Sequence, residues 1–151
     1  MTVHQLSVFA ENKSGTIQRV LDLLKEGNIQ IIASTIADTT DYGIYRIICS
    51  EPTRAYEALR AAGIQVSLTD VFAITLENEV GKAADTIKLF SDAGIDISYL
   101  YSFMLGDKGI LIFRTKDAEK AHEIIMLNKL NFVAEKDLSK LLLSDKNQKE
   151  K

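Results

Sequence analysis

The 151-residue chain contains 46% hydrophobic and 26% charged residues, a composition typical of a folded globular protein. Its net charge of −3 gives no electrostatic reason to expect binding to a nucleic-acid backbone. A single cysteine, Cys49, excludes an intrachain disulfide and a thiolate metal cluster. No signal peptide is visible and no apolar run approaches ~18 residues, so we expect a cytoplasmic protein without membrane association.

The first half of the chain predicts six elements. Leu6, Val8 and Ala10 alternate with other residues, as in a half-buried strand. Apolar residues at i, i+3, i+4 and i+7 then predict a helix from Ile17 that ends at Asn28. An extended run at 29–38, a hairpin turn at 41–43 and a returning strand at 44–49 follow. A helix opened by Glu51 and the only proline, Pro52, then leads to a closing strand at 64–68.

The second half repeats this order 66 residues later. The segment Glu11 to Gly15 reappears as Glu77 to Gly81, and Asn28 is replaced by Gly94 at the end of the next helix. A strand at 72–76 and a helix from 83 come first. An extended run from 95, a hairpin turn from 107 and a returning strand from 110 follow. A helix from 117 and a closing strand from 130 complete the second half.

The order βαββαβ, read twice, predicts an α+β fold of two ferredoxin-like units, each with an antiparallel sheet and both helices on one face. We expect the units to cover residues 1–70 and 71–136, followed by a short helix at 137–143 and a disordered tail. Residues 65–78 run from the last strand of one unit directly into the first strand of the next, so no linker separates the units.

A strand that ends in an acidic or amide residue, followed by a short loop to a glycine at a helix start, resembles the ACT domain. The helix in that family ends in a sequence such as Gly-Ile-Asn-Ile, and the chain has Gly94-Ile95-Asp96-Ile97 and Asn28-Ile29-Gln30-Ile31. The chain resembles a stand-alone tandem ACT domain protein over residues 3–136. It departs from the family where a frequent Pro-Gly is replaced by Ser14-Gly15 and Val80-Gly81.

The resemblance implies a regulatory module that binds a small molecule, most often an amino acid, between paired ACT units. The implied ligand contacts are the loop after the first strand and the start of the second strand of the facing unit. Carried over to this chain, they are Asn12, Lys13, Ser14, Gly15, Thr16, Asn28, Ile29, Asn78, Glu79, Val80, Gly81, Lys82, Ile95 and Asp96. We expect no cofactor and no metal, and as partners an amino acid or similar metabolite, a second copy in a homodimer and an enzyme of amino-acid metabolism.

The residue chemistry is consistent with such a ligand. A helix N-terminus offers free N–H groups to a carboxylate, and glycine lets the ligand approach the backbone. Asn12 and Asn78 can donate or accept, while Glu79 or Asp96 can hold an ammonium group. The asparagines and glycines can equally serve only as helix caps and turn residues.

The two extended runs differ in one respect. Ala33, Thr35 and Ala37 share a face in the first, whereas the matching positions of the second hold three aromatic residues, Tyr99, Tyr101 and Phe103. Such rings suit packing between units, the lining of a pocket or ordinary core packing.

The sequence disfavours two other classes of function and leaves a third open. Catalysis is disfavoured because His4 and His122 belong to no motif and Cys49 lies in an apolar strand. RNA binding is disfavoured because aliphatic residues fill most of the positions at 108–113 where stacking aromatics would be needed. A structural or interaction module of the same fold with no small ligand remains the alternative.

Overall fold

The computed structural model describes residues 1–11, 15–38, 42–138 and 140. The chain forms two compact units. One consists of residues 4–69, and the other consists of residues 1–3 together with the chain from Asp70 onward. We call them the N-terminal and C-terminal units. The division falls inside one strand, β4 (Val66–Leu76), so the predicted run from the first unit into the second is continuous backbone. None of the described helices is long and apolar enough to cross a membrane.

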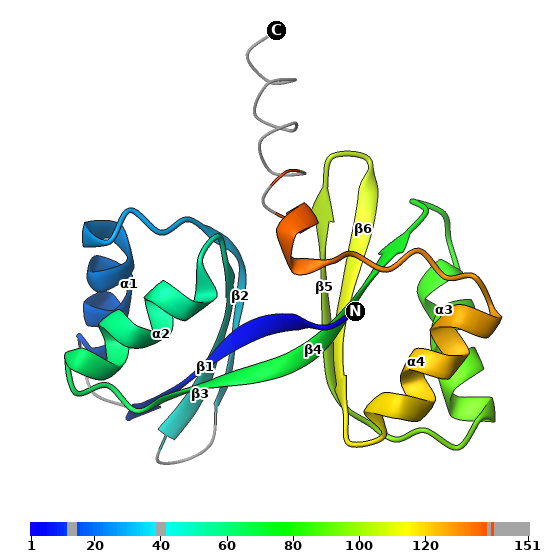
Figure 1. Ribbon diagram of the computed structural model, residues 1–151, viewed down its shortest axis with the longest axis horizontal. Helices are drawn as coiled ribbons and strands as arrows, with labels where there is room; N and C mark the ends of the chain where they lie inside the picture. Colours follow the sequence, from blue (N-terminus) through cyan, green and yellow to red (C-terminus); the bar gives the residue numbers. More distant parts are fainter. Residues whose placement is uncertain (12–14, 39–41, 139, 141–151) are drawn as a thin grey trace, which may run out of the picture. The chain divides into compact units, whose positions relative to one another are not determined.

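The N-terminal unit contains β1 (Val3–Glu11), α1 (Thr16–Glu26), β2 (Ile31–Asp38), β3 (Tyr42–Cys49), α2 (Pro52–Ala61) and the first residues of β4. Its strand order is β2-β3-β1-β4, with β3 antiparallel to both β1 and β2. The two helices lie together on one face of this sheet (Figure 1). Between them and the sheet, the alternating Leu6 and Val8 pack with the helical Val20 and Leu24, all nearly inaccessible to solvent.

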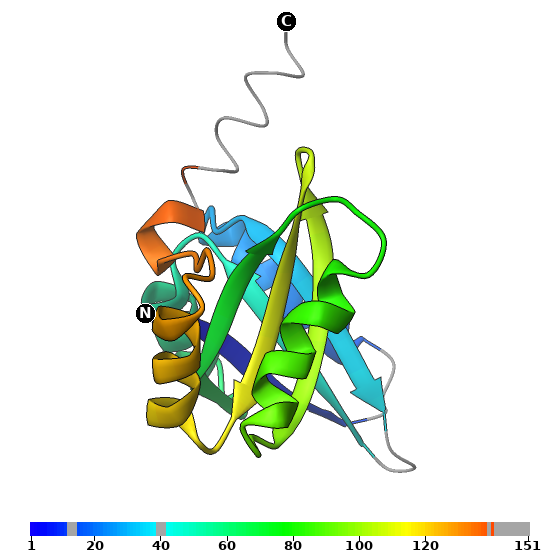
Figure 2. The ribbon, with the colours of Figure 1, turned by 90° about the vertical axis from the view of Figure 1, so that its right-hand side faces the viewer.

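The C-terminal unit repeats this arrangement with the rest of β4, α3 (Lys82–Asp92), β5 (Ile97–Leu105), β6 (Lys108–Thr115) and α4 (Ala118–Leu127). β6 lies between β4 and β5 and is antiparallel to both. Figure 2 shows both helices on the near face of this sheet. Phe90 and Phe72 each contact the ring of Phe113, with centroids 4.9 and 5.2 Å apart, and form the centre of the core. The predicted α+β fold of two βαββαβ units is confirmed.

The helix ends agree with the sequence pattern. Asn28 and Gly94 both follow a helix with positive φ, 54° and 74°, the left-handed conformation that ends a helix. The next residues, Ile29 and Ile95, donate their N–H groups back to Leu24 and Phe90 and bury their side chains. Each helix is thereby turned into the strand that follows.

The residues at the two predicted hairpin turns lie partly inside strands. Tyr42 and Gly43 pair with β1 as strand residues, and the predicted turn residue Asp41 lies outside the described residues. In the C-terminal unit the turn is Gly106-Asp107, with Gly106 at φ 65°, whereas Gly109 pairs with Leu76 inside β6. A glycine at the first central position satisfies the positive φ of a two-residue hairpin, so the prediction of Asp107 to Gly109 was wrong.

The closing strand predicted at 130–134 is reduced to one bridge, Phe132 with Ile74. The Thr75 N–H donates to the Asn131 carbonyl, and the Val133 N–H donates to the Ala73 carbonyl. The chain then bends, since the Asp137 N–H donates to the Ala134 carbonyl. Residues 135–138 and 140 are helical, two residues earlier than predicted. The predicted continuation to residue 143 and the predicted disordered tail lie outside the described residues.

Candidate ligand-binding site

The loop between β4 and α3 is an exposed turn. Residues 77–81 are all exposed, including the apolar Val80. The Glu79 N–H donates to the Glu77 carbonyl at 2.8 Å, and the Lys82 N–H donates to the Glu79 carbonyl at 3.4 Å. These bonds fold the loop onto itself and direct the chain into α3.

Gly81 sets the geometry of this helix start. It caps α3 with φ 89° and ψ −6°, and its carbonyl accepts the Asp85 N–H at 2.9 Å. A Cβ at this position would meet nothing within 4 Å, so the glycine is required by its backbone conformation and not by lack of space. Helix geometry leaves the N–H groups of Ala83 and Ala84 without an acceptor inside α3, at the partly positive end of the helix.

Two ion pairs border the loop. Lys108 Nζ lies 2.8 Å from Glu77 Oε1, which connects the base of the loop to the start of β6. The hydrogen bond and charge of Lys108 lower the pKa of the Glu77 carboxyl, and Glu77 in turn raises the pKa of Lys108. Lys82 Nζ lies 3.6 Å from Glu79 Oε2 between largely exposed side chains, so a charged ligand can compete for either partner.

Asn78 is exposed, and no hydrogen bond of its side chain is found within the part of the chain that the structure describes. It does not cap α3, because the capping position belongs to Gly81 and lacks a side-chain cap hydrogen bond. Its amide therefore keeps both its donors and its acceptor for another molecule.

The corresponding loop of the N-terminal unit has the same helix start. Gly15 caps α1 with φ 90° and ψ −11°, and its carbonyl accepts the Arg19 N–H at 2.9 Å. Thr16 is the first residue of α1 and is half-buried. The other three predicted residues of this loop, Asn12, Lys13 and Ser14, lie outside the described residues.

The second predicted group lies at the opposite end of each first helix. Asn28 and Asp96 are exposed, whereas the side chains of Ile29 and Ile95 are buried in the two cores. In the N-terminal unit this end is hollowed, with a cavity volume of about 520 Å³ lined by Leu21, Leu24, Lys25, Asn28, Ile29, Gln30, Ile31 and Ser50.

One unit cannot bring the two groups together. The 11 residues of α3 separate Gly81 from Gly94 by about 16 Å along the helix axis. A ligand of amino-acid size therefore cannot contact the loop and the second-strand start of the same unit.

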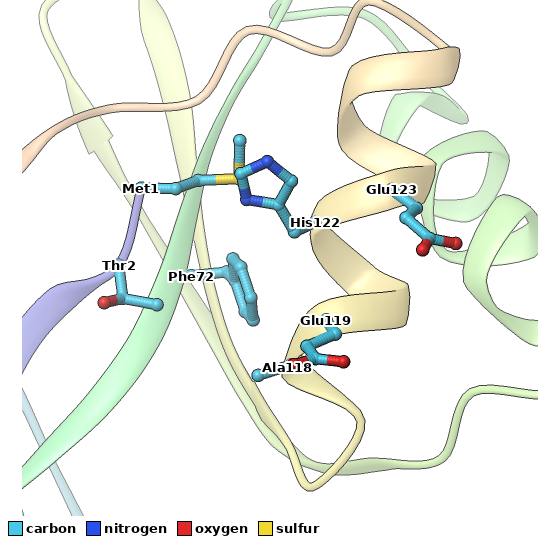
Figure 3. Close-up of a pocket in the computed structure, with 7 residues that line it drawn as sticks. All are labelled: Met1, Thr2, Phe72, Ala118, Glu119, His122 and Glu123. Atoms are coloured by element: carbon cyan, nitrogen blue, oxygen red, sulfur yellow. The ribbon is translucent and has the colours of Figure 1, made fainter.

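A second hollow, which the sequence did not predict, lies in the C-terminal unit. Figure 3 shows its lining from the N-terminal residues Met1 and Thr2, from β4 and from α4; the lining residues are Met1, Thr2, Phe72, Ala118, Glu119, His122 and Glu123. It shares no residue with the predicted site. The described part of the chain contains no group of three side chains suited to hold a metal ion.

A family model described as an ACT domain pair matches residues 1–142. The chain belongs to this family. The resemblance noted from the repeated loop and helix ends is thus confirmed. As an ACT domain pair, the chain is a regulatory ligand-binding module.

Solved structures share the fold of this chain. Protein BT0572 from Bacteroides thetaiotaomicron is 36% identical with a TM-score of 0.87, and the match covers 91% of this chain and 96% of that one. The regulatory subunit of aspartate kinase from Thermus thermophilus is 15% identical with a TM-score of 0.57, over 82% of this chain and 90% of that one, which shows a shared fold. No curated protein sequence matches the chain.

Proposed function

We propose that this ACT domain pair binds a free amino acid or a similar small metabolite and regulates a separate partner enzyme, or its own association, through that binding. The observation that carries the proposal is the loop at 77–82. It combines an unpaired asparagine amide, a left-handed glycine and an open helix start in one exposed place. This is the position at which the ACT resemblance puts a ligand.

The chemistry of an amino acid fits the groups present. Its carboxylate suits the N–H groups of Ala83 and Ala84, because they project from the partly positive end of α3. Its ammonium group suits the Glu79 carboxylate, since the ion pair of Glu79 with Lys82 is long and exposed. The Asn78 amide can accept from the ammonium or donate to the carboxylate. Asp96 and Asn28, at the other end of the helices, are proposed to complete the contacts from a facing unit.

The two loops share their helix start, so the proposal extends to Gly15 and Thr16 and to the preceding Asn12, Lys13 and Ser14. The base of the loop differs between the units. Lys108 pairs with Glu77 in the C-terminal unit, whereas the matching Tyr42 stacks on Phe9 at 5.0 Å. We therefore propose that the two loops, where both hold ligand, bind with different affinities.

A thermal-shift screen against the twenty amino acids tests this function. A ligand at about 100 times its Kd stabilises the native state by about 2.7 kcal/mol. For a chain of this size, that corresponds to a rise in melting temperature of roughly 5–10 °C. The proposal expects such a rise with one amino acid or a few chemically related ones. A flat response to all twenty and to their close metabolites would contradict it and favour a ligand-free interaction module.

A further inference from the structure

The hollow beside α4 is a second cavity of the C-terminal unit, separate from the loop at 77–82. It has a volume of about 490 Å³, which is in the range of pockets that hold small organic molecules. Every residue that lines it belongs to this one unit. We call it the α4 hollow; its lining residues are Met1, Thr2, Phe72, Ala118, Glu119, His122 and Glu123.

The floor of the α4 hollow is apolar. Phe72 is only 4% exposed and stacks on Phe113 in the core, and the Met1 side chain packs against the same core. Figure 3 shows the Phe72 ring between the N-terminal segment and α4. A thioether beside a ring forms a surface on which an aromatic or aliphatic group packs favourably. The floor therefore suits the apolar part of a ligand.

The wall that α4 contributes is acidic. Glu119 and Glu123 are one helical turn apart, which places their Cβ atoms about 5–6 Å from each other. Neither glutamate, nor His122 between them, has a hydrogen bond or ion pair within the part of the chain that the structure describes. Lys116 and Lys120 line an adjoining hollow and do not line this one. The two carboxylates therefore leave a negative charge that a cation can compensate.

The internal repeat shows how the N-terminal unit fills the matching place. Tyr56 lies 66 residues before His122 and packs on the core of its unit. Arg60 Nη1 donates a hydrogen bond to the Tyr56 hydroxyl at 3.0 Å, and the guanidinium carbon lies 5.8 Å from the centre of the ring. The residue that matches Arg60 is Met126, so the C-terminal unit has neither the ring nor the cation at this place.

We propose that the α4 hollow binds a small organic cation, an amine that carries an aromatic or aliphatic group. The ammonium group lies at the carboxylates of Glu119 and Glu123, and the apolar group packs on Phe72 and Met1. The bound amine thus supplies the ring and the cation that Tyr56 and Arg60 supply in the N-terminal unit. A carboxylate on the ligand would be repelled by the same glutamates, so this ligand differs from the amino acid proposed for the loop. The inference does not depend on that proposed function.

A titration followed by backbone amide chemical shifts tests the site with three probes. Phenethylammonium has the ring and the charge, hydrocinnamate has the same skeleton with a carboxylate, and methylammonium has the charge alone. We expect phenethylammonium to shift the amides of Thr2, Phe72 and His122 with a Kd of about 1 mM or tighter, and both controls to bind at least about tenfold more weakly. No saturable shift by about 10 mM, shifts confined to other residues, or equal binding of either control would overturn the proposal.

Two variants test the assigned groups. Glu119→Gln/Glu123→Gln removes both charges and preserves the shape of the wall, so the Kd should rise at least about threefold. Glu57→Gln is the matched control, because Glu57 is exposed and has the position of Glu123 in the N-terminal unit. His122→Tyr/Met126→Arg copies the ring and the cation of the N-terminal unit into the hollow and should abolish binding. Wild-type affinity in either double variant, or an equal loss in Glu57→Gln, would contradict the assignment.

Discussion

Gly81→Ala isolates the backbone conformation at the start of α3. The native φ is 89°, and an added Cβ would have no neighbour within 4 Å, so the substitution introduces backbone strain without a steric clash. Holding an L-residue in a left-handed conformation costs roughly 1–2 kcal/mol. We expect the free energy of unfolding to fall by this amount.

Urea denaturation measures this change. With an m-value of about 2 kcal/mol/M, the loss corresponds to a midpoint lowered by roughly 0.5–1 M with an unchanged slope. Gly109→Ala is the matched control, since Gly109 lies inside β6 without positive φ and its Cβ would lie 3.6 Å from the Leu76 Cβ, an ordinary contact. A Gly81→Ala midpoint equal to the wild type, or an equal loss in Gly109→Ala, would refute the reasoning.

Three further predictions concern the whole fold. Phe90→Ala should cost about 3–5 kcal/mol, because the ring is fully buried against Phe113, and calorimetry should show it as a lower melting temperature; a loss below 1 kcal/mol would contradict this packing. Expressed alone, residues 1–70 should aggregate or fail to melt cooperatively, since the cut falls inside β4; a stable monomer would disprove this. Because the fold lowers the pKa of Glu77, its pairing stabilises the protein above the unfolded-state pKa and is lost as the pH falls through the folded-state pKa. Urea midpoints of Lys108→Gln and wild type should therefore differ at neutral pH and converge in acid; a constant difference would count against the pair.

The fold could be predicted from the sequence because its strongest signals are local and occur twice. Alternation placed Leu6 and Val8 in the core, and the residue types at 28 and 94 predicted the left-handed helix ends. The second hairpin turn was misplaced because Gly109 resembles a turn residue but lies inside β6, and Gly43 likewise lies inside β3. The Gly106-Asp107 dipeptide was the available signal for the second turn.

The contacts around the candidate site were harder to predict. The ion pair of Lys108 with Glu77 joins residues 31 positions apart. The position that matches Lys108 in the N-terminal unit holds Tyr42, so the repeat gave no indication of this ion pair. The hollow beside Phe72 combines the first residues of the chain with α4, which only the folded backbone brings together. The sequence did indicate the loop, because glycine and asparagine recur at the same distance before both helices.

Isothermal titration calorimetry with the amino acid found in the screen tests the proposed site most directly. Asn78→Ala removes the amide, and Ala83→Pro removes one backbone donor in the first turn of α3, where proline is tolerated. The control for Asn78→Ala is Asn131→Ala, which removes an exposed asparagine outside the loop. The control for Ala83→Pro is Ala118→Pro, which places a proline in the first turn of α4. Losing a hydrogen bond to a charged group costs about 1.5–3 kcal/mol, so each site variant should bind roughly tenfold to a hundredfold more weakly, with both controls unchanged. Wild-type affinity in both site variants would contradict the placement of the ligand at this loop.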